Sequence, residues 1–386
     1  MTEPRHVAGP GHGPGGAPTA IALTPILSAR YRTRDLERIR AAAPGARIVN
    51  VSVEGLADGP VDDVEVLLRG WLSADAFDRL LARTPRLVWV HSASAGVERV
   101  LTRAGRERGL VITNARGVFS RPIAEYVMMM ILAVSRRLPQ LLELQHERTW
   151  QPLEGAELRD VTVGIVGLGS IGRAVGALAT AFGCRVIATR RRSEAGAAPA
   201  EPPNGSTDQD ETATAGPADG GQSDAGPADA GPADAGPVEH PLGGMMLDRV
   251  LGPDGLPDLL AESDFVVLAA PLTPETEGMI NDETLAQVKR GAWIINVARG
   301  RLIDERALTR ALRDGRIGGA VLDTFAEEPL PPDSPFYDLP NVIVTPHTAW
   351  STGRVLDRSV VLFCDNLTRF AAGEPLLNVV DPAVGY

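Results

Sequence analysis

The chain has 386 residues, of which 44% are hydrophobic and 23% charged, and its formal net charge is −11 at pH 7. This is the composition of a soluble globular protein with enough length for two domains. It contains no run of eighteen apolar residues and no apolar N-terminal segment, so we expect neither a transmembrane helix nor a signal peptide. Two cysteines, Cys184 and Cys364, are too few for a disulfide framework and fit a reducing cytoplasm.

The first part of the chain alternates between predicted strands and predicted helices. Residues 1–19 are rich in Gly and Pro and are expected to form a disordered tail. Short apolar runs bounded by Gly, Pro, Asn or Ser then predict strands at 20–27, 47–51, 64–70, 87–92 and 111–114. Helical patterns at 34–43 and 73–84 lie between them, and this alternation predicts a parallel sheet with crossover helices.

A long helix is expected from about residue 121 to residue 147, and a second alternating series follows it. Strands are predicted at 161–167, 185–190, 265–271, 293–298, 319–325 and 341–347, and an amphipathic helix at 354–373 closes with Gly373. The series is interrupted at 194–246 by an Ala-Gly-Pro-Asp repeat with very few large apolar residues, which predicts a disordered insertion. This segment carries ten acidic residues and no Lys or Arg, so the rest of the chain is left near −1. A nearly neutral folded part argues against a nucleic-acid surface as its main purpose.

The sequence GLGSIG at 167–172 follows a predicted strand and opens a helical pattern. Gly167, Gly169 and Gly172 permit a tight turn and a close backbone approach to a pyrophosphate, which would sit at the helix N-terminus beside Ser170 and Ile171. An ordinary turn between strand and helix is the alternative. The strand–turn–helix context favours a dinucleotide site.

An arginine run, Arg190 to Arg192, ends the next predicted strand. Arg190 lies 21 residues after Gly169, where an acidic residue that binds the ribose 2′-hydroxyl is usual. An arginine pairs instead with a 2′-phosphate, and Arg191 can add to this. NADP(H) is therefore the favoured cofactor and NAD(H) remains possible. The alternative is a solvated basic strand end beside an acidic segment.

Three charged residues, Arg299, Asp323 and His347, come just after or at the ends of predicted strands in the second series. Carboxyl ends of parallel strands meet at one edge of a sheet, where α/β proteins bind their ligands. Of the six histidines, only His91 and His347 end strands, and a lone histidine is more often structural than functional. Asp304 fits best as the N-cap of the helix that follows it. We expect no metal site.

These residues together resemble the D-isomer-specific 2-hydroxyacid dehydrogenases. The motifs are GLGSIG, PLTPET (271–276), INVARG, DTFAEEP and TPHTAW, in the family's order. The resemblance runs from about residue 64 to residue 378 and implies two doubly wound parallel-sheet domains. A Rossmann nucleotide domain (118–346) would be inserted into a flavodoxin-like substrate domain (20–117 and 347–386). The family is usually dimeric, which implies a homodimer through the long helix and the region of Trp150.

The resemblance also assigns roles. Arg299 would bind the substrate carboxylate together with the backbone N–H groups of Ala95 and Gly96, His347 would be the acid/base, and Glu328 would pair with it, with Glu327 the neighbour to rule out. Asp323 would hold the nicotinamide carboxamide. The remaining cofactor contacts would come from the glycine turn, the arginine run, Pro271, Thr276 and Val297.

The substrate implied is a small 2-oxo or D-2-hydroxy acid, and no nucleic-acid or membrane partner is expected. Trp350, shortly after His347, resembles members that reduce glyoxylate and hydroxypyruvate. Arg69 and His91 could touch the far end of a substrate or be structural. The rival interpretation is a partner-binding protein that senses dinucleotides, because some relatives act as corepressors and keep the same charged residues.

Overall fold

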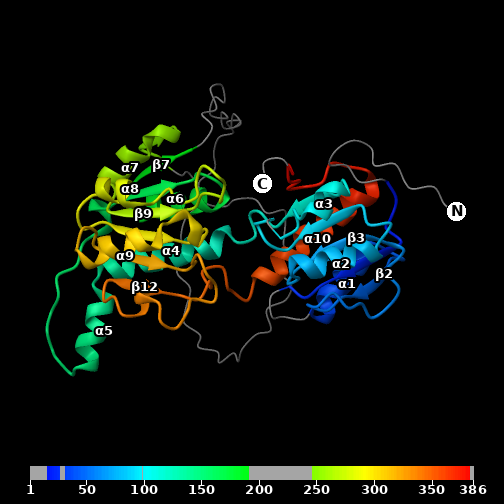
Figure 1. The fold of residues 1–386 in the computed structure, drawn as a ribbon, viewed down its shortest axis with the longest axis horizontal. Coiled ribbons are helices and arrows are strands. Elements are labelled where there is room, and N and C mark those ends of the chain that lie inside the picture. The colour runs from blue at the N-terminus through cyan, green and yellow to red at the C-terminus, as the bar shows by residue number, and fades with distance from the viewer. Residues whose placement is uncertain (1–14, 27–30, 98, 191–245, 383–386) are drawn as a thin grey trace, which may run out of the picture. The chain divides into compact units, whose positions relative to one another are not determined.

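The computed structural model describes residues 15–26, 31–97, 99–190 and 246–382. It contains two parallel sheets (Figure 1). The first sheet has the strand order β2-β1-β3-β4-β5 and the second the order β12-β11-β10-β9-β6-β7-β8. The predicted fold class of two doubly wound parallel-sheet domains is therefore confirmed.

The elements follow the predicted alternation. The strands are β1 (Ala20–Leu23), β2 (Arg47–Asn50), β3 (Val64–Arg69), β4 (Trp89–Ser92), β5 (Val111–Asn114), β6 (Thr162–Val166), β7 (Arg185–Thr189), β8 (Arg249–Leu251), β9 (Phe265–Leu268), β10 (Trp293–Asn296), β11 (Gly319–Leu322) and β12 (Val342–Val344). The α-helices are α1 (Thr33–Ala42), α2 (Ala74–Arg83), α3 (Arg103–Glu107), α4 (Ser120–Ser135), α5 (Leu138–His146), α6 (Ser170–Ala181), α7 (Leu256–Glu262), α8 (Asp282–Gln287), α9 (Glu305–Arg313) and α10 (Val355–Ala372).

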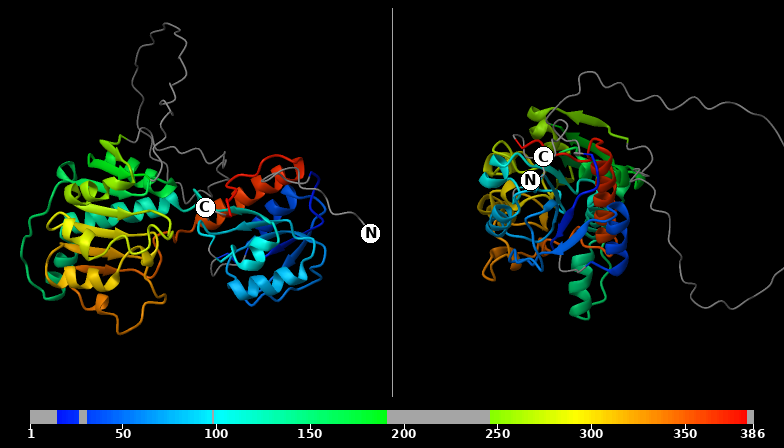
Figure 2. Two further views of the ribbon diagram at one scale, coloured as in Figure 1. Left: turned by 45° about the horizontal axis from the view of Figure 1, so that its top comes forward. Right: turned by 90° about the vertical axis from the view of Figure 1, so that its right-hand side faces the viewer.

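The first sheet is covered on both faces by helices. Phe77 of α2 packs on one face, and Ile39 of α1 and Phe363 of α10 pack on the other, around the buried Trp89 of β4. The C-terminal helix α10, coloured red, thus lies against the blue α1 in Figures 1 and 2. It ends at Gly373, whose φ of +72° gives the left-handed conformation that closes a helix. The chain therefore returns to its first sheet after completing the second.

The second sheet is also buried on both faces. Helices α4 and α6 cover one face, and α7, α8 and α9 cover the other. Strand β6 lies between β7 and β9, so the strand order reverses beside β6. In open α/β sheets ligands bind outside the carboxyl ends of the strands at such a reversal. The GLGSIG sequence begins directly after β6.

The predicted long helix is wrong in one respect, because it is two helices. Arg137 has a φ of +57° and separates α4 from α5, and Pro139 is the second residue of α5. Proline has no N–H and its ring clashes with the carbonyl four residues earlier, which is that of Ser135. That carbonyl accepts the N–H of Ala156 at 2.8 Å instead. The apolar pattern continued through the break and concealed it.

Several predictions lie partly outside the described residues. The insertion at 194–246 is described only at residue 246, and the N-terminal tail only from residue 15. Within the tail, Gly16 donates its N–H to Ala371 O at 2.6 Å, so the described part of the tail contacts the folded chain. No helix within the described ranges is long and apolar enough to cross a membrane.

Candidate active site

The turn after β6 can be built only from glycine at two positions. Gly167 has a φ of +101°, and a Cβ there would lie 2.7 Å from the backbone of Ala270. A Cβ on Gly172 would lie 2.2 Å from the carbonyl oxygen of Gly167. The first glycine therefore permits the turn beside β9, and the third lets α6 pack closely against it.

Gly169 has a different role, because space over it is open. A Cβ at this position would meet nothing within 4 Å, and Gly169 is the N-cap of α6. Glycine has no side chain to cap a helix, so the first N–H groups of α6, at Ser170 and Ile171, have no side-chain acceptor from this residue. A helix N-terminus with open space before it fits the pyrophosphate of a dinucleotide.

Two further segments carry residues predicted to contact the cofactor. Arg190 follows β7 and is half-buried, and its N–H donates to Leu251 O at 2.9 Å, which places it at the carboxyl end of the β7–β8 edge. Arg191 lies outside the described residues. After β9, the Thr276 hydroxyl donates to Pro271 O at 2.7 Å and accepts the N–H of Thr273 at 2.8 Å. The hydroxyl of Thr276 therefore closes its own loop.

The segment carrying Arg299 is shaped by the buried Asn296. The Asn296 side chain accepts the N–H of Ala298 at 3.1 Å and donates to Arg299 O at 2.9 Å, which turns the chain at the end of β10. Val297 is buried within this turn. A Cβ on Gly300 would lie 1.8 Å from the carbonyl carbon of Phe325. The Arg299 segment therefore lies directly against the loop that carries Glu328.

Glu328 and His347 are hydrogen-bonded to each other across two strand ends. Glu328 Oε2 lies 2.8 Å from His347 Nδ1, and Glu328 Oε1 accepts the N–H of Phe325 at 3.0 Å. Burial raises the pKa of Glu328, but the hydrogen bonds from His347 and Phe325 and the nearby charges of His347 and Arg299 outweigh it and hold the pKa below its usual range. Glu328, and not its neighbour Glu327, therefore pairs with the histidine.

His347 follows β12 in an unusual backbone conformation. Its φ is +51°, a left-handed value that non-glycine residues rarely adopt, and its N–H donates to Thr345 O at 3.0 Å. Because Nδ1 faces Glu328, the other ring nitrogen, Nε2, is the one placed to exchange a proton with a ligand. The side chain is 42% exposed, so a ligand can reach it.

Asp323 is buried at the end of β11, and its carboxylate already binds three donors. They are the Thr345 hydroxyl at 2.6 Å and the N–H groups of Thr348 at 2.8 Å and Ala349 at 3.0 Å. Burial raises the pKa of Asp323 above its usual value, although these hydrogen bonds lower it. Three of about four acceptor positions are therefore used, and one remains for a further donor.

The predicted substrate loop follows β4 in the first sheet. Asn114 Nδ2 donates to Ala95 O at 2.9 Å, and the Ser94 hydroxyl donates to Gly96 O at 2.5 Å. These contacts fix the loop backbone. The loop belongs to the first sheet and Arg299 and His347 to the second, so their joint use in one site stays a prediction.

Arg69 and His91 are both buried in structural contacts. Arg69 donates to Leu72 O and lies over the Phe77 ring, and burial, with repulsion from Arg99, lowers its pKa to about 10. His91 Nδ1 lies 2.7 Å from the Thr113 hydroxyl, and full burial lowers its pKa to about 3. His91 is therefore neutral at physiological pH, and the structural interpretation holds for it.

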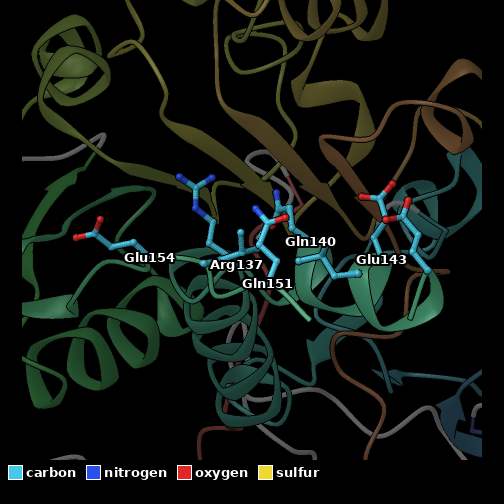
Figure 3. A pocket seen from close by; sticks show the side chains of 8 residues that line it. Arg137, Gln140, Glu143, Gln151 and Glu154 are labelled. Carbon is cyan, nitrogen blue, oxygen red and sulfur yellow. The ribbon is translucent and has the colours of Figure 1, made fainter. Parts of the chain in front are cut away.

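A pocket outside this site lies beside α5 (Figure 3). Its lining includes Arg137, Gln140, Glu143, Gln151 and Glu154, with both carboxylates and amides around the opening. None of the residues predicted from the sequence for catalysis or binding lines it. Trp350, which the sequence singled out beside His347, also lies away from this pocket. Its ring packs edge-on against that of Phe119, with ring centroids 6.3 Å apart.

Comparisons with known proteins show the family to which the chain belongs. The sequence profile described as "D-isomer specific 2-hydroxyacid dehydrogenase, NAD binding domain" matches residues 128–213 and 246–349. A glyoxylate reductase of Aeropyrum pernix is 30% identical over 317 residues, which are 79% of this chain and 79% of that protein. The chain belongs to the D-isomer-specific 2-hydroxyacid dehydrogenase family.

Two further relatives define how far the likeness extends. A D-3-phosphoglycerate dehydrogenase of Mycobacterium tuberculosis is 33% identical over 322 residues, which are 83% of this dehydrogenase and 51% of that longer protein. A family member from Xanthobacter autotrophicus Py2, solved in complex with NADPH and MES, is 29% identical with a TM-score of 0.74 and covers 96% of this chain and 100% of its own. This dehydrogenase is thus an NAD(P)-dependent oxidoreductase that acts on a small-molecule hydroxy acid.

Sequence reasoning did not find every residue of this site. The hydroxyl of Thr345, just after β12, is hydrogen-bonded to the Asp323 carboxylate, which lies 22 residues earlier in the sequence. The hydroxyl of Tyr126 in α4 is hydrogen-bonded in turn to Thr345, 219 residues later. Tyr126 belongs to no motif recognised in the sequence, and Thr345, the first residue of TPHTAW, has no role assigned to it there. A hydroxyl beside a strand end, as at Thr345, was the one signal available.

Proposed function

We propose that this dehydrogenase reduces small 2-oxo acids of the glyoxylate and hydroxypyruvate kind to 2-hydroxy acids, with NADPH as the preferred cofactor. The observation that carries the proposal is the 2.8 Å pair between His347 and Glu328, held at the carboxyl ends of the parallel strands with Arg299 beside it. An imidazole paired with an ionised carboxylate and lying next to a guanidinium can protonate an oxygen of a bound anion.

The roles follow from charge. Arg299 and the backbone N–H groups of Ala95 and Gly96 bind the carboxylate of the 2-oxo acid and orient its C2 carbonyl. Negative charge develops on the carbonyl oxygen as C2 is reduced, and protonated His347 donates the Nε2 proton to it. Glu328 stabilises the imidazolium through Nδ1 and fixes the ring orientation.

The residues after β6 fit a dinucleotide. The open N-terminus of α6 at Gly169, Ser170 and Ile171 would hold the pyrophosphate, and Gly167 and Gly172 leave the room that this requires. The nicotinamide supplies the hydride when the cofactor is bound. Further contacts are proposed for the β9 and β10 loops and for the open acceptor position of the Asp323 carboxylate, at Pro271, Thr276, Val297 and Asp323.

Preference for NADPH rests on Arg190 and, by sequence, on Arg191. An arginine at the end of the second strand of the nucleotide sheet pairs with the 2′-phosphate, whereas the usual acid repels it. The NADPH in the Xanthobacter relative supports the same preference. We expect Arg190→Ala to raise the KM for NADPH about tenfold or more and to leave the KM for NADH nearly unchanged.

The same strand offers a matched control. Arg185, at the opposite end of β7, pairs with Glu262 at 2.8 Å and should not contact the cofactor. Arg185→Ala should therefore leave the NADPH/NADH ratio of kcat/KM as in the unaltered protein. An equal change in this ratio for both variants would show that Arg190 acts through general charge and not through the 2′-phosphate.

A panel of 2-oxo acids decides the substrate. Oxidation of NADPH and NADH would be followed with glyoxylate, hydroxypyruvate, pyruvate and longer 2-oxo acids. The highest kcat/KM is expected with glyoxylate and hydroxypyruvate. Activity with none of them would refute the proposal and favour the dinucleotide-sensing partner-binding protein.

We also infer a homodimer formed through α4 and α5. Met129, Leu138, Leu141 and Phe182 are exposed apolar side chains that together line one shallow apolar hollow on and beside these helices, and Leu142 and Trp150 are exposed as well. Contiguous exposed apolar surface of this kind is typical of an interface. Leu142→Glu should convert the dimer to a monomer in light scattering, and an unchanged mass would contradict this interface.

We also propose the domain boundaries. Residues 20–117 and 347–386 form the substrate domain, and residues 118–346 form the nucleotide domain. The packing of α10 on α1 supports the joining of the two outer segments. The unpaired thiols of Cys184 and Cys364 fit the proposed cytoplasmic location.

A further inference from the structure

Three hydroxyl and carboxylate groups form a hydrogen-bonded chain that begins on α4. The Tyr126 hydroxyl lies 2.6 Å from Thr345 Oγ1, and Thr345 Oγ1 lies 2.6 Å from Asp323 Oδ1. An ionised carboxylate only accepts hydrogen bonds, so the Thr345 hydroxyl donates its proton to Asp323. The Tyr126 hydroxyl must then be the donor to Thr345. All donors of the chain therefore point toward the Asp323 carboxylate.

The same carboxylate holds the backbone on the far side of His347. Asp323 Oδ1 accepts the N–H of Thr348, and Oδ2 accepts the N–H of Ala349. Thr345 precedes His347 by two residues and Thr348 follows it directly, so one carboxylate binds both sides of the turn. The left-handed backbone of His347, with φ of +51°, is unfavourable for a non-glycine residue unless its surroundings enforce it.

We propose that Tyr126 and Thr345 are positioning residues for His347, which they hold through the Asp323 carboxylate. The inference rests on the acid/base role proposed for His347. Neither hydroxyl touches the imidazole. They complete the set of donors that fixes the Asp323 carboxylate, and this carboxylate fixes the turn that aims Nε2.

The alternative is that the three side chains form these hydrogen bonds only because each would otherwise be a buried polar group without a partner. Buried polar groups nearly always find partners, and a lost partner then affects stability alone. The arrangement here differs because its end point is the backbone of the acid/base residue. Misplacing a catalytic group by a fraction of an ångström lowers turnover without changing ground-state binding to the same extent. The two explanations therefore separate in kcat, in KM and in the pH profile.

The central test replaces Thr345. Thr345→Val keeps the shape of the side chain but removes the donor to Asp323 and the acceptor for Tyr126. We expect kcat for 2-oxo acid reduction to fall about tenfold, which is the order expected for one hydrogen bond to a charged group, with KM within about twofold. Tyr126→Phe, which removes only the outer donor, should lower kcat about threefold. Thr345→Ser restores the hydroxyl and should recover most of the lost kcat.

The pH profile gives a readout that a structural role would not move. Loss of the Thr345 donor destabilises the ionised Asp323, so this carboxyl takes up its proton at a higher pH. The acid limb of kcat/KM should therefore move to higher pH in Thr345→Val and by a smaller amount in Tyr126→Phe. In Thr345→Ser it should lie at the same pH as in the unaltered protein.

A matched control lies in the first sheet's part of the chain. The Tyr31 hydroxyl donates to Thr24 O at 2.8 Å, so Tyr31→Phe also removes one tyrosine hydroxyl and one hydrogen bond. It should lower the melting temperature and leave both kcat and the pH profile unchanged. Equal effects of Tyr31→Phe and Tyr126→Phe on kcat, or a normal kcat and acid limb in folded Thr345→Val, would overturn the inference.

Failure of the proposed function would look different. In that case the unaltered protein would show no turnover with any 2-oxo acid. The inference could still be judged without substrate, from the NMR signals of the His347 imidazole. These should shift and broaden in Thr345→Val and not in Tyr31→Phe, and an unchanged His347 signal would refute the positioning role.

Discussion

Gly300 offers the most direct test of how the site is assembled. A Cβ added there would lie 1.8 Å from Phe325 C and 2.2 Å from Ala326 N, whereas ordinary contacts begin at 3.4 Å. Gly300→Ala therefore requires the two backbones to move apart by about 1.6 Å, since neither atom is the end of a flexible side chain. The movement would separate Arg299 from the loop that carries Glu328. Misplacements of about 1 Å lower turnover about 10²-fold, and overpacking costs about 1–3 kcal/mol of stability.

The assay compares turnover with folding. We expect Gly300→Ala to remain folded with a reduced melting temperature and to lose about 10²-fold in kcat for the best 2-oxo acid. Gly59→Ala is the matched control, because its Cβ would meet only Arg47 Nη1 at 3.6 Å, an ordinary contact. Its kcat should be normal. A stable Gly300→Ala protein with normal kcat would refute the view that this close approach sets the geometry of Arg299 and Glu328.

Three other variants probe single groups of the molecule. His347→Ala should lower kcat about 10²–10⁴-fold while the protein still binds NADPH, as measured by fluorescence titration, and near-normal turnover would exclude His347 as the acid/base. Glu328→Gln removes the negative charge that stabilises the imidazolium of His347. The alkaline limb of kcat/KM for 2-oxo acid reduction should therefore move to lower pH, and an unmoved limb would contradict the pairing role of Glu328. Asp304 accepts the N–H groups of Arg306 and Ala307 as the N-cap of α9, so Asp304→Ala should cost about 1 kcal/mol in denaturant unfolding with kcat unchanged, and an unaltered midpoint would show that water replaces the cap.

Much of the fold could be predicted because buried parallel strands are short apolar runs with polar ends. The strands from β1 to β7 and from β9 to β12 all lie within predicted runs. Strand β8 could not be found this way. It has three residues, Arg249 to Leu251, at the edge of the sheet, and its central Val250 is exposed, so it has no apolar signature.

The division between α4 and α5 was also missed, although Pro139 marks it. Leu138, Leu141 and Leu142 continue the apolar pattern across the break, so the pattern alone predicts a single helix. These leucines are exposed, so their spacing does not reflect a buried helix face. Periodicity alone does not distinguish a side chain packed in the core from one available to a partner.

The candidate site was predictable where its residues end strands. Arg299, Asp323, Glu328 and His347 all follow, or stand at the end of, strands that the sequence predicts. The bond from Tyr126 was not predictable, because it joins a helix to a turn 219 residues away and depends on how α4 lies over the sheet. Side-chain contacts between distant elements require the packed structure, whereas strand ends require only the topology.

The long connection between β7 and β8 lies at the edge of the second sheet. Strands β7 and β8 flank residues 190–248, yet they pair in parallel, with Ile187 opposite Arg249. Two adjacent parallel strands need a connection of about a dozen residues or more, and closing a longer connection costs little extra free energy. This junction, beside an edge strand and outside the β6–β9 reversal, is thus where chain length can change while the registers of the central strands are kept. It is the natural position for inserting a reporter domain or trimming the connection, provided that about a dozen residues remain.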